Sequence, residues 1–156
     1  MDTHTVTINA AFLREIKDDD VQLKTLLEQA RAICDSSALA DISASRFTKL
    51  LADLRDHLAM HFALEEAYGY FDDPLSVAPH LSEQAESLRT QHGQLYGELA
   101  RLAETAQDIS RRDSDPRAIR NLARCFMEFH DRLQQHEEDE NELIMEALYV
   151  DIGGSG

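Results

Sequence analysis

Apolar residues that alternate three and four positions apart form four long seams in this sequence, and no other feature constrains its fold as strongly. Residues at that spacing lie on one face of an α-helix, which packs that face against other helices. Glycine and proline are scarce, and helix-favouring Leu, Ala, Glu, Gln and Arg fill the stretches between them. We therefore expect an all-α protein, an antiparallel up-down-up-down four-helix bundle, because short links make neighbouring helices antiparallel.

Capping residues and helix breakers mark where the first two helices begin and end. The first helix should follow Asn9 and run to about Cys34. The second should follow the segment Asp35–Ser45 and end near Gly69. These two helices form the first antiparallel pair of the predicted bundle.

Proline marks the start of each helix in the second pair. The third helix begins at about Pro79, and the fourth begins at Asp115-Pro116, where a capping residue precedes a proline at the first helical position. A chain of 156 residues is the size of one ordinary domain. We predict one bundle domain over residues 1–152, followed by a flexible Gly/Ser tail over 153–156.

Two of the seams are interrupted by the same pair of polar residues. The seam of the fourth helix runs through Ile119, Leu122, Phe126, Phe129, Leu133, His136, Glu140, Leu143 and Ala147. The seam of the second helix runs through Phe47, Leu51, Leu54, Leu58, His61, Glu65 and Tyr68. His136 and Glu140 must face the core with their apolar neighbours, and His61 and Glu65 repeat them at a constant offset. The chain therefore reads as two loosely repeated helix pairs.

The other two seams each contain one polar residue. The seam of the third helix runs through Leu81, Ala85, Leu88, His92, Leu95, Leu99, Leu102, Ala106 and Ile109. The seam of the first helix runs through Phe12, Ile16, Asp20, Leu23, Leu27 and Ala30. His92 and Asp20 occupy matching places in the two pairs, at a similar depth in the bundle to the His-x-x-x-Glu pairs.

This set of buried imidazoles and carboxylates predicts a metal centre. Each buried charge without compensation would cost several kcal/mol, and a pair of metal ions would compensate all of them. Histidine and glutamate four residues apart present a nitrogen and an oxygen on one helical face. Mixed nitrogen and oxygen ligands suit iron or manganese better than calcium or structural zinc.

Three motifs of this sequence resemble those of the hemerythrin HHE domain. They are HF-x-x-EE at His61–Glu66, Q-H-x-x-L at Gln91–Leu95 and HE-x-x-E at His136–Glu140. The motifs occur in the expected order and spacing, and the resemblance covers nearly the whole chain. It implies a four-helix bundle with an oxygen-bridged di-iron centre that binds dioxygen or nitric oxide, or senses oxygen, redox state or iron.

The resemblance also implies a role for each matched residue. Glu65 and Glu140 would be the bridging carboxylates, and His61, His92 and His136 would be terminal ligands. Manganese and zinc are the alternatives to the two iron ions. The expected ligand of the centre is a small diatomic molecule or peroxide.

The sequence departs from the family pattern at two positions. The first helix has Asp20 where the family usually has histidine, so Asp20 either ligates as an oxygen donor or hydrogen-bonds a ligand. The third helix has Tyr96 where the oxygen-carrying branch has a second histidine. Fewer nitrogen ligands favour redox cycling or sensing over reversible oxygen carriage.

The other histidines, tyrosines, glutamates and cysteines that we considered receive ordinary roles, with His57 as the one possible further ligand. His57, one turn before His61, is an additional ligand or a histidine beside the centre. We expect surface positions for His4, His80 and His130, core positions for Tyr68 and Tyr96, solvated positions for Glu66, Glu137 and Glu138, and packing roles for Cys34 and Cys125.

The charge of the chain limits its partners. Thirty acidic residues stand against fifteen basic ones, which disfavours nucleic acid and anionic lipid. The sequence shows neither a signal peptide nor a membrane span, so we expect a cytoplasmic protein, and it gives no indication of a protein partner.

Several functions compete with a binding or sensing domain. A ferritin-like oxidase needs Glu-x-x-His on two helices, and a zinc protease needs a histidine where Glu140 stands. A metal-dependent oxidoreductase that detoxifies peroxide or nitric oxide stays open, as does a metal-free structural bundle. We expect a binding or sensing domain more than a substrate-turning enzyme.

Overall fold

Four long helices make up the described part of the chain. The computed structural model describes residues 10–35, 44–67, 81–112 and 115–154, and within these the side chains of 21–35, 44–66, 81, 83–112 and 115–146. The helices are α1 (Ala10–Asp35), α2 (Ala44–Ala67), α4 (Ser82–Arg111) and α5 (Pro116–Gly154). No strand occurs in these residues.

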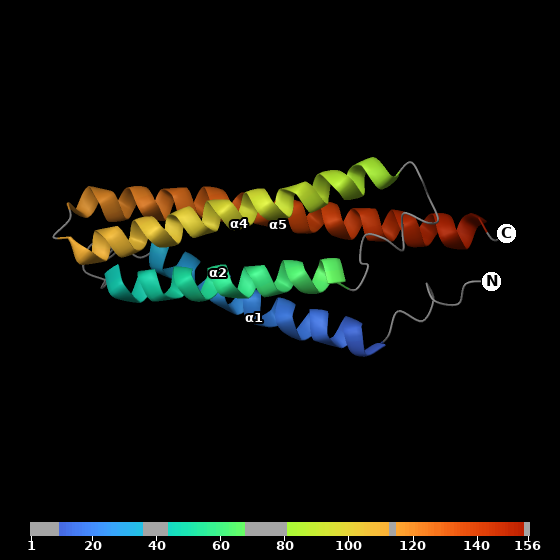
Figure 1. The fold of residues 1–156 in the computed structure, drawn as a ribbon, viewed down its shortest axis with the longest axis horizontal. Helices are drawn as coiled ribbons and strands as arrows, with labels where there is room; N and C mark the ends of the chain where they lie inside the picture. The colour runs from blue at the N-terminus through green and yellow to red at the C-terminus, as the bar shows by residue number, and fades with distance from the viewer. Residues whose placement is uncertain (1–9, 36–43, 68–80, 113–114, 155–156) are drawn as a thin grey trace.

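The four helices form an antiparallel bundle. Figure 1 shows α1 and α4 running in one direction and α2 and α5 running in the other. Helix α2 packs against α1 and α4, and α5 packs against α4 and α1. The predicted up-down-up-down four-helix bundle is therefore confirmed.

The start of α5 follows the predicted capping signal. The backbone N–H of Arg117 donates to the Asp115 side chain (N to Oδ1, 3.1 Å), and the N–H of Ala118 donates to the Asp115 carbonyl oxygen at 2.9 Å. Pro116 occupies the first helical position, where a backbone N–H is not needed. The predicted boundaries at Asn9, Gly69 and Pro79 lie outside the described residues.

The apolar core fills the end of the bundle where α1 leads to α2 and α4 leads to α5. Phe47, Phe126 and Phe129 are almost completely buried, and the Phe47 and Phe126 rings meet edge to face with centroids 6.1 Å apart. Among the seam residues whose side chains the structure describes, all are buried except Ile109, which is partly buried. The seams therefore identify the core correctly.

His130 is buried, so its predicted surface position is wrong. Only 5% of its surface is exposed, and its ring lies 6.2 Å from that of Phe126. Ala123, Met127 and His130 form a second stripe beside the main seam of α5, because this helix packs against both α1 and α4 and buries more than one narrow seam. Tyr96, predicted in the core, is 38% exposed. The predictions for His4, Tyr68 and His80 lie outside the described residues.

His130→Ala should destabilise the fold and leave metal binding unchanged. Truncation leaves a cavity beside Phe126, and core substitutions of this kind cost roughly 1–3 kcal/mol. Chemical denaturation would measure the free energy of unfolding, and elemental analysis the bound metal. Loss of metal on the scale of a ligand substitution would show that His130 belongs to the metal centre.

Acid should destabilise the protein in part through His130. Burial lowers the pKa of His130, and the positive charge of Arg31 lowers it further against a smaller opposing effect of Asp131. As pH falls through the ordinary histidine value of 6.5, the unfolded chain takes up a proton that the folded chain resists, so folding stability decreases. His130→Leu should lose less stability than the parent between about pH 7.5 and about pH 5.5, with both proteins metal-free. An equal loss in both would exclude this contribution.

No described helix is long and apolar enough to span a membrane.

Candidate metal centre

Five ligand-type residues from three helices are buried together near the middle of the bundle. They are His61 and Glu65 on α2, His92 on α4, and His136 and Glu140 on α5, each at most 4% exposed. All five are interruptions of the predicted apolar seams. Helical periodicity therefore places their side chains inward, as it places the leucines above and below them.

His92 joins the two carboxylates across the bundle. Its Nε2 lies 3.1 Å from Glu140 Oε2 and 3.4 Å from Glu65 Oε1. Each glutamate also faces a histidine of its own helix, one turn earlier. His136 Nε2 is 3.0 Å from Glu140 Oε2, and His61 Nε2 is 3.5 Å from Glu65 Oε2. Both His-x-x-x-Glu pairs thus converge on one point.

The two buried carboxyl groups have very different proton affinities. Burial raises the pKa of Glu65 to about 7, and the negative charge of Glu140 adds to the increase against the lowering effect of His92. Burial acts in the same direction on Glu140, but the neighbouring imidazoles of His136 and His92 lower its pKa to about 2. The pair interacts strongly, and one carboxylate is easier to ionise than two.

The neighbouring carboxylates determine whether His92 is charged. Burial alone would lower the pKa of His92, but the neighbouring carboxyl groups of Glu140, Glu65 and Glu66 raise it to about 10. Without a metal, His92 therefore carries a proton on Nε2, and the positive charge of its ring compensates the buried carboxylates. A metal ion bound there would displace that proton.

Two buried polar atoms of the centre have no hydrogen-bond partner among the described residues. They are Oε1 of Glu65 and Nε2 of His136. Such atoms are costly in an apolar interior. Ligand atoms of His92, His136 and Glu140 also lie within 4.8 Å of one another. The donor set and its unsatisfied atoms fit a bound cation.

Two further residues contact the outer nitrogens of the histidines. His92 Nδ1–H donates to Glu66 Oε2 at 2.8 Å, and His136 Nδ1–H donates to Gln91 Oε1 at 2.7 Å. Glu66 is exposed as predicted, with 43% of its side chain accessible, but it is bound to the centre and not only to solvent. Its position one residue off the α2 seam gave no signal of this contact, because its side chain reaches across to α4.

Phe62 closes the centre on one side. Its ring stacks on His92 with centroids 3.9 Å apart and planes inclined by 9°, and it meets the His136 ring edge to face at 5.6 Å. It also lies 5.9 Å from the ring of His61. Phe62 thus touches all three imidazoles and holds the plane of His92.

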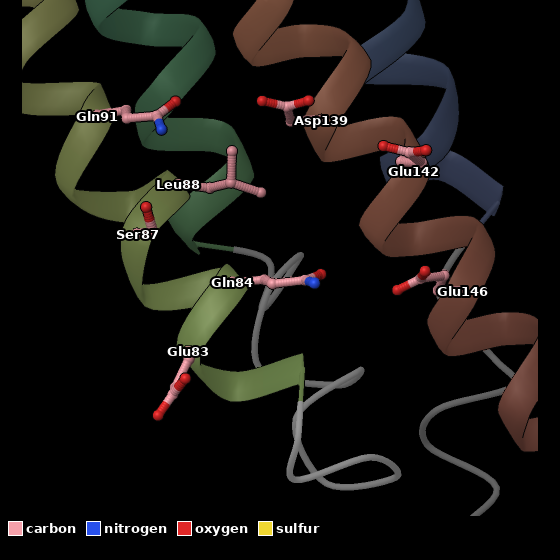
Figure 2. Close-up of a pocket in the computed structure, with 8 residues that line it drawn as sticks. All are labelled: Glu83, Gln84, Ser87, Leu88, Gln91, Asp139, Glu142 and Glu146. Atoms are coloured by element: carbon pink, nitrogen blue, oxygen red, sulfur yellow. The ribbon is translucent and has the colours of Figure 1, made fainter.

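An acidic groove runs between α4 and α5 beside the centre. Its volume is about 440 Å³. Its lining residues, shown in Figure 2, are Glu83, Gln84, Ser87, Leu88, Gln91, Asp139, Glu142 and Glu146. Gln91 belongs both to this lining and to the hydrogen bond with His136, so it separates the buried histidine from the groove.

Two predicted site residues are not brought to the centre by the described geometry. Asp20 lies in α1, but its side chain is outside the described part of that helix. His57 is partly buried and lines a separate groove on α1 and α2 with Asp53 and Met60. Metal binding by either residue stays a prediction.

Comparison with known proteins gives one family. The family model described as the hemerythrin HHE cation binding domain matches residues 11–148. Neither the curated proteins nor the solved structures include a significant match.

Proposed function

Because this chain belongs to the hemerythrin HHE cation-binding family, we propose that its buried centre binds two iron ions and uses them to bind or sense a small ligand. The observation that carries this proposal is the convergence of five buried imidazole and carboxylate groups whose atoms are only partly satisfied by one another. Metal ions would complete their coordination and compensate the buried negative charge.

Each residue of the centre is proposed in a specific role. Glu65 and Glu140, which both approach Nε2 of His92, would be the bridging carboxylates. His61, His92 and His136 are terminal nitrogen ligands. Asp20 supplies a sixth ligand from α1, and His57 is a further ligand or a neighbour of the centre. The mixed nitrogen and oxygen set favours iron, with manganese or zinc as the alternatives.

The surrounding residues control access to the centre. Phe62 and the apolar core exclude water from one side, while the groove that Gln91 helps to line gives a small molecule an approach from the other. Bound iron would supply a change of oxidation state and a coordination position for dioxygen, nitric oxide or peroxide. Tyr96 provides no nitrogen ligand and is partly exposed, which favours sensing over reversible oxygen carriage.

Anaerobic loading with ferrous iron tests the function directly. The loaded protein should gain near-ultraviolet charge-transfer absorption when it is exposed to air or nitric oxide. Turnover of added peroxide would select the detoxifying oxidoreductase instead. A protein that stays colourless and iron-free after reconstitution would select the metal-free structural bundle and exclude the proposal.

A further inference from the structure

We propose that Glu66 and Gln91 are positioning residues that fix which nitrogen of His92 and His136 coordinates metal, and that the charge of Glu66 lowers the reduction potential of the centre. The inference rests on the proposed function, because it concerns the same five buried groups. It adds two residues outside these five groups, on different helices. One of them, Glu66, contacts its histidine through a charged carboxylate, and the other, Gln91, through a neutral amide. The hydrogen bonds that carry the inference are 2.8 Å long at His92 and 2.7 Å long at His136.

The first step concerns the proton on the outer nitrogen. A histidine has two ring nitrogens, and the partner of one decides which lone pair is available at the other. The carboxylate oxygen of Glu66 and the amide oxygen of Gln91 can only accept hydrogen bonds. Nδ1 of each histidine must therefore carry a proton, and Nε2, which points toward Glu140 in both cases, is left to coordinate.

The second step concerns the orientation of the His92 ring. Phe62 stacks on this ring at 3.9 Å with nearly parallel planes. The stacking prevents the ring from tilting. The hydrogen bond to Glu66 prevents it from turning about the bond that joins the ring to the rest of the side chain. Together the two contacts aim Nε2 at the gap between Glu65 and Glu140. The effect of Glu66 on the centre thus passes through His92.

The third step concerns charge. A carboxylate that accepts the outer N–H of a ligating histidine raises the basicity of the coordinating nitrogen, whereas a neutral amide does so less. Glu66 therefore adds electron density through His92, while Gln91 adds less through His136. Greater donation and an added negative charge favour the more oxidised metal. Glu66 should lower the reduction potential, and the two histidines should be inequivalent ligands.

The experiment compares four single variants of the full chain and one double variant, Glu66→Gln combined with Gln91→Glu. Glu66→Gln keeps a hydrogen-bond acceptor and removes the charge, Glu66→Ala removes both, and Gln91→Glu adds a charge on the His136 side. Glu104→Gln is the matched control, because Glu104 is exposed on α4 and stands twelve residues, about 18 Å of helix, beyond His92. Ferrous affinity is measured by competition with a coloured chelator, and the potential by redox titration of the iron-loaded protein.

The expected results separate charge from positioning. Glu66→Gln should raise the potential and weaken iron binding about 10-fold, and Glu66→Ala should weaken it up to about 100-fold, the range found for outer contacts of metal ligands. Gln91→Glu should lower the potential, and Glu66→Gln combined with Gln91→Glu should return it toward the parent value. Glu104→Gln should change neither quantity.

Two results would overturn the inference, and they differ in what they leave standing. If the parent protein binds iron and Glu66→Gln matches Glu104→Gln in affinity and potential, Glu66 does not act on the centre, although the proposed function survives. If the parent protein binds no iron, the proposed function fails and this inference fails with it.

Discussion

Replacing His136 with alanine should weaken iron binding by more than about 100-fold. Loss of an outer contact to a metal ligand costs roughly 10–100-fold, and His136→Ala removes the ligand itself. It also removes an imidazole that holds down the pKa of the Glu140 carboxyl group, so this buried group becomes harder to ionise and a poorer ligand in turn. Competition with a chelator gives the affinity, and elemental analysis gives the iron retained.

His130→Ala provides a matched control for this experiment. Both histidines lie on α5, and both are at most 5% exposed. They differ in surroundings, since His136 faces Glu140 at 3.0 Å and His130 packs on Phe126. Only the His136 variant should lose iron. Equal retention by the two variants would contradict the assignment of His136 as a ligand.

Binding of metal should stabilise the fold by several kcal/mol. A ligand that binds only the folded state, at a free concentration of a thousand times its dissociation constant, contributes about 4 kcal/mol. For a domain of this size each kcal/mol raises the melting temperature by roughly 2–4 °C. Anaerobic ferrous iron should therefore raise the melting temperature by roughly 8–16 °C, as measured by circular dichroism.

The same measurement on the His136→Ala variant isolates the contribution of the centre. In the metal-free chain the buried groups compensate one another incompletely, because Oε1 of Glu65 and Nε2 of His136 lack hydrogen-bond partners. The variant has lost a ligand, so iron should shift its melting temperature little. A shift as large as that of the parent would show that iron stabilises the protein at some other place.

The residues that follow helical periodicity could be predicted from the sequence. A polar residue in an apolar seam, such as His92 or Glu140, must face inward because its neighbours do. That argument needs only the position of each residue on its own helix. It therefore located the core and the five buried groups of the centre without knowledge of how the helices pack.

The residues that depend on packing between helices could not be predicted in this way. His130 is buried because α5 has two neighbours, which widens its buried face beyond one seam. Glu66 lies on an exposed face of α2. Its carboxylate comes within 2.8 Å of His92 Nδ1 only because of how α4 packs beside α2. A second apolar stripe at Ala123 and Met127 was the available signal for His130. Helical periodicity gave no signal for Glu66, although Glu66 is the last residue of the HF-x-x-EE motif.

Iron stoichiometry tests the central claim most directly. The protein is loaded anaerobically with excess ferrous iron, freed of unbound metal, and analysed for iron per chain beside the His136→Ala variant treated in parallel. The account predicts two iron ions per parent chain and a large loss in the variant. Parent protein that retains no more iron than the variant would contradict the existence of a metal centre at these five residues.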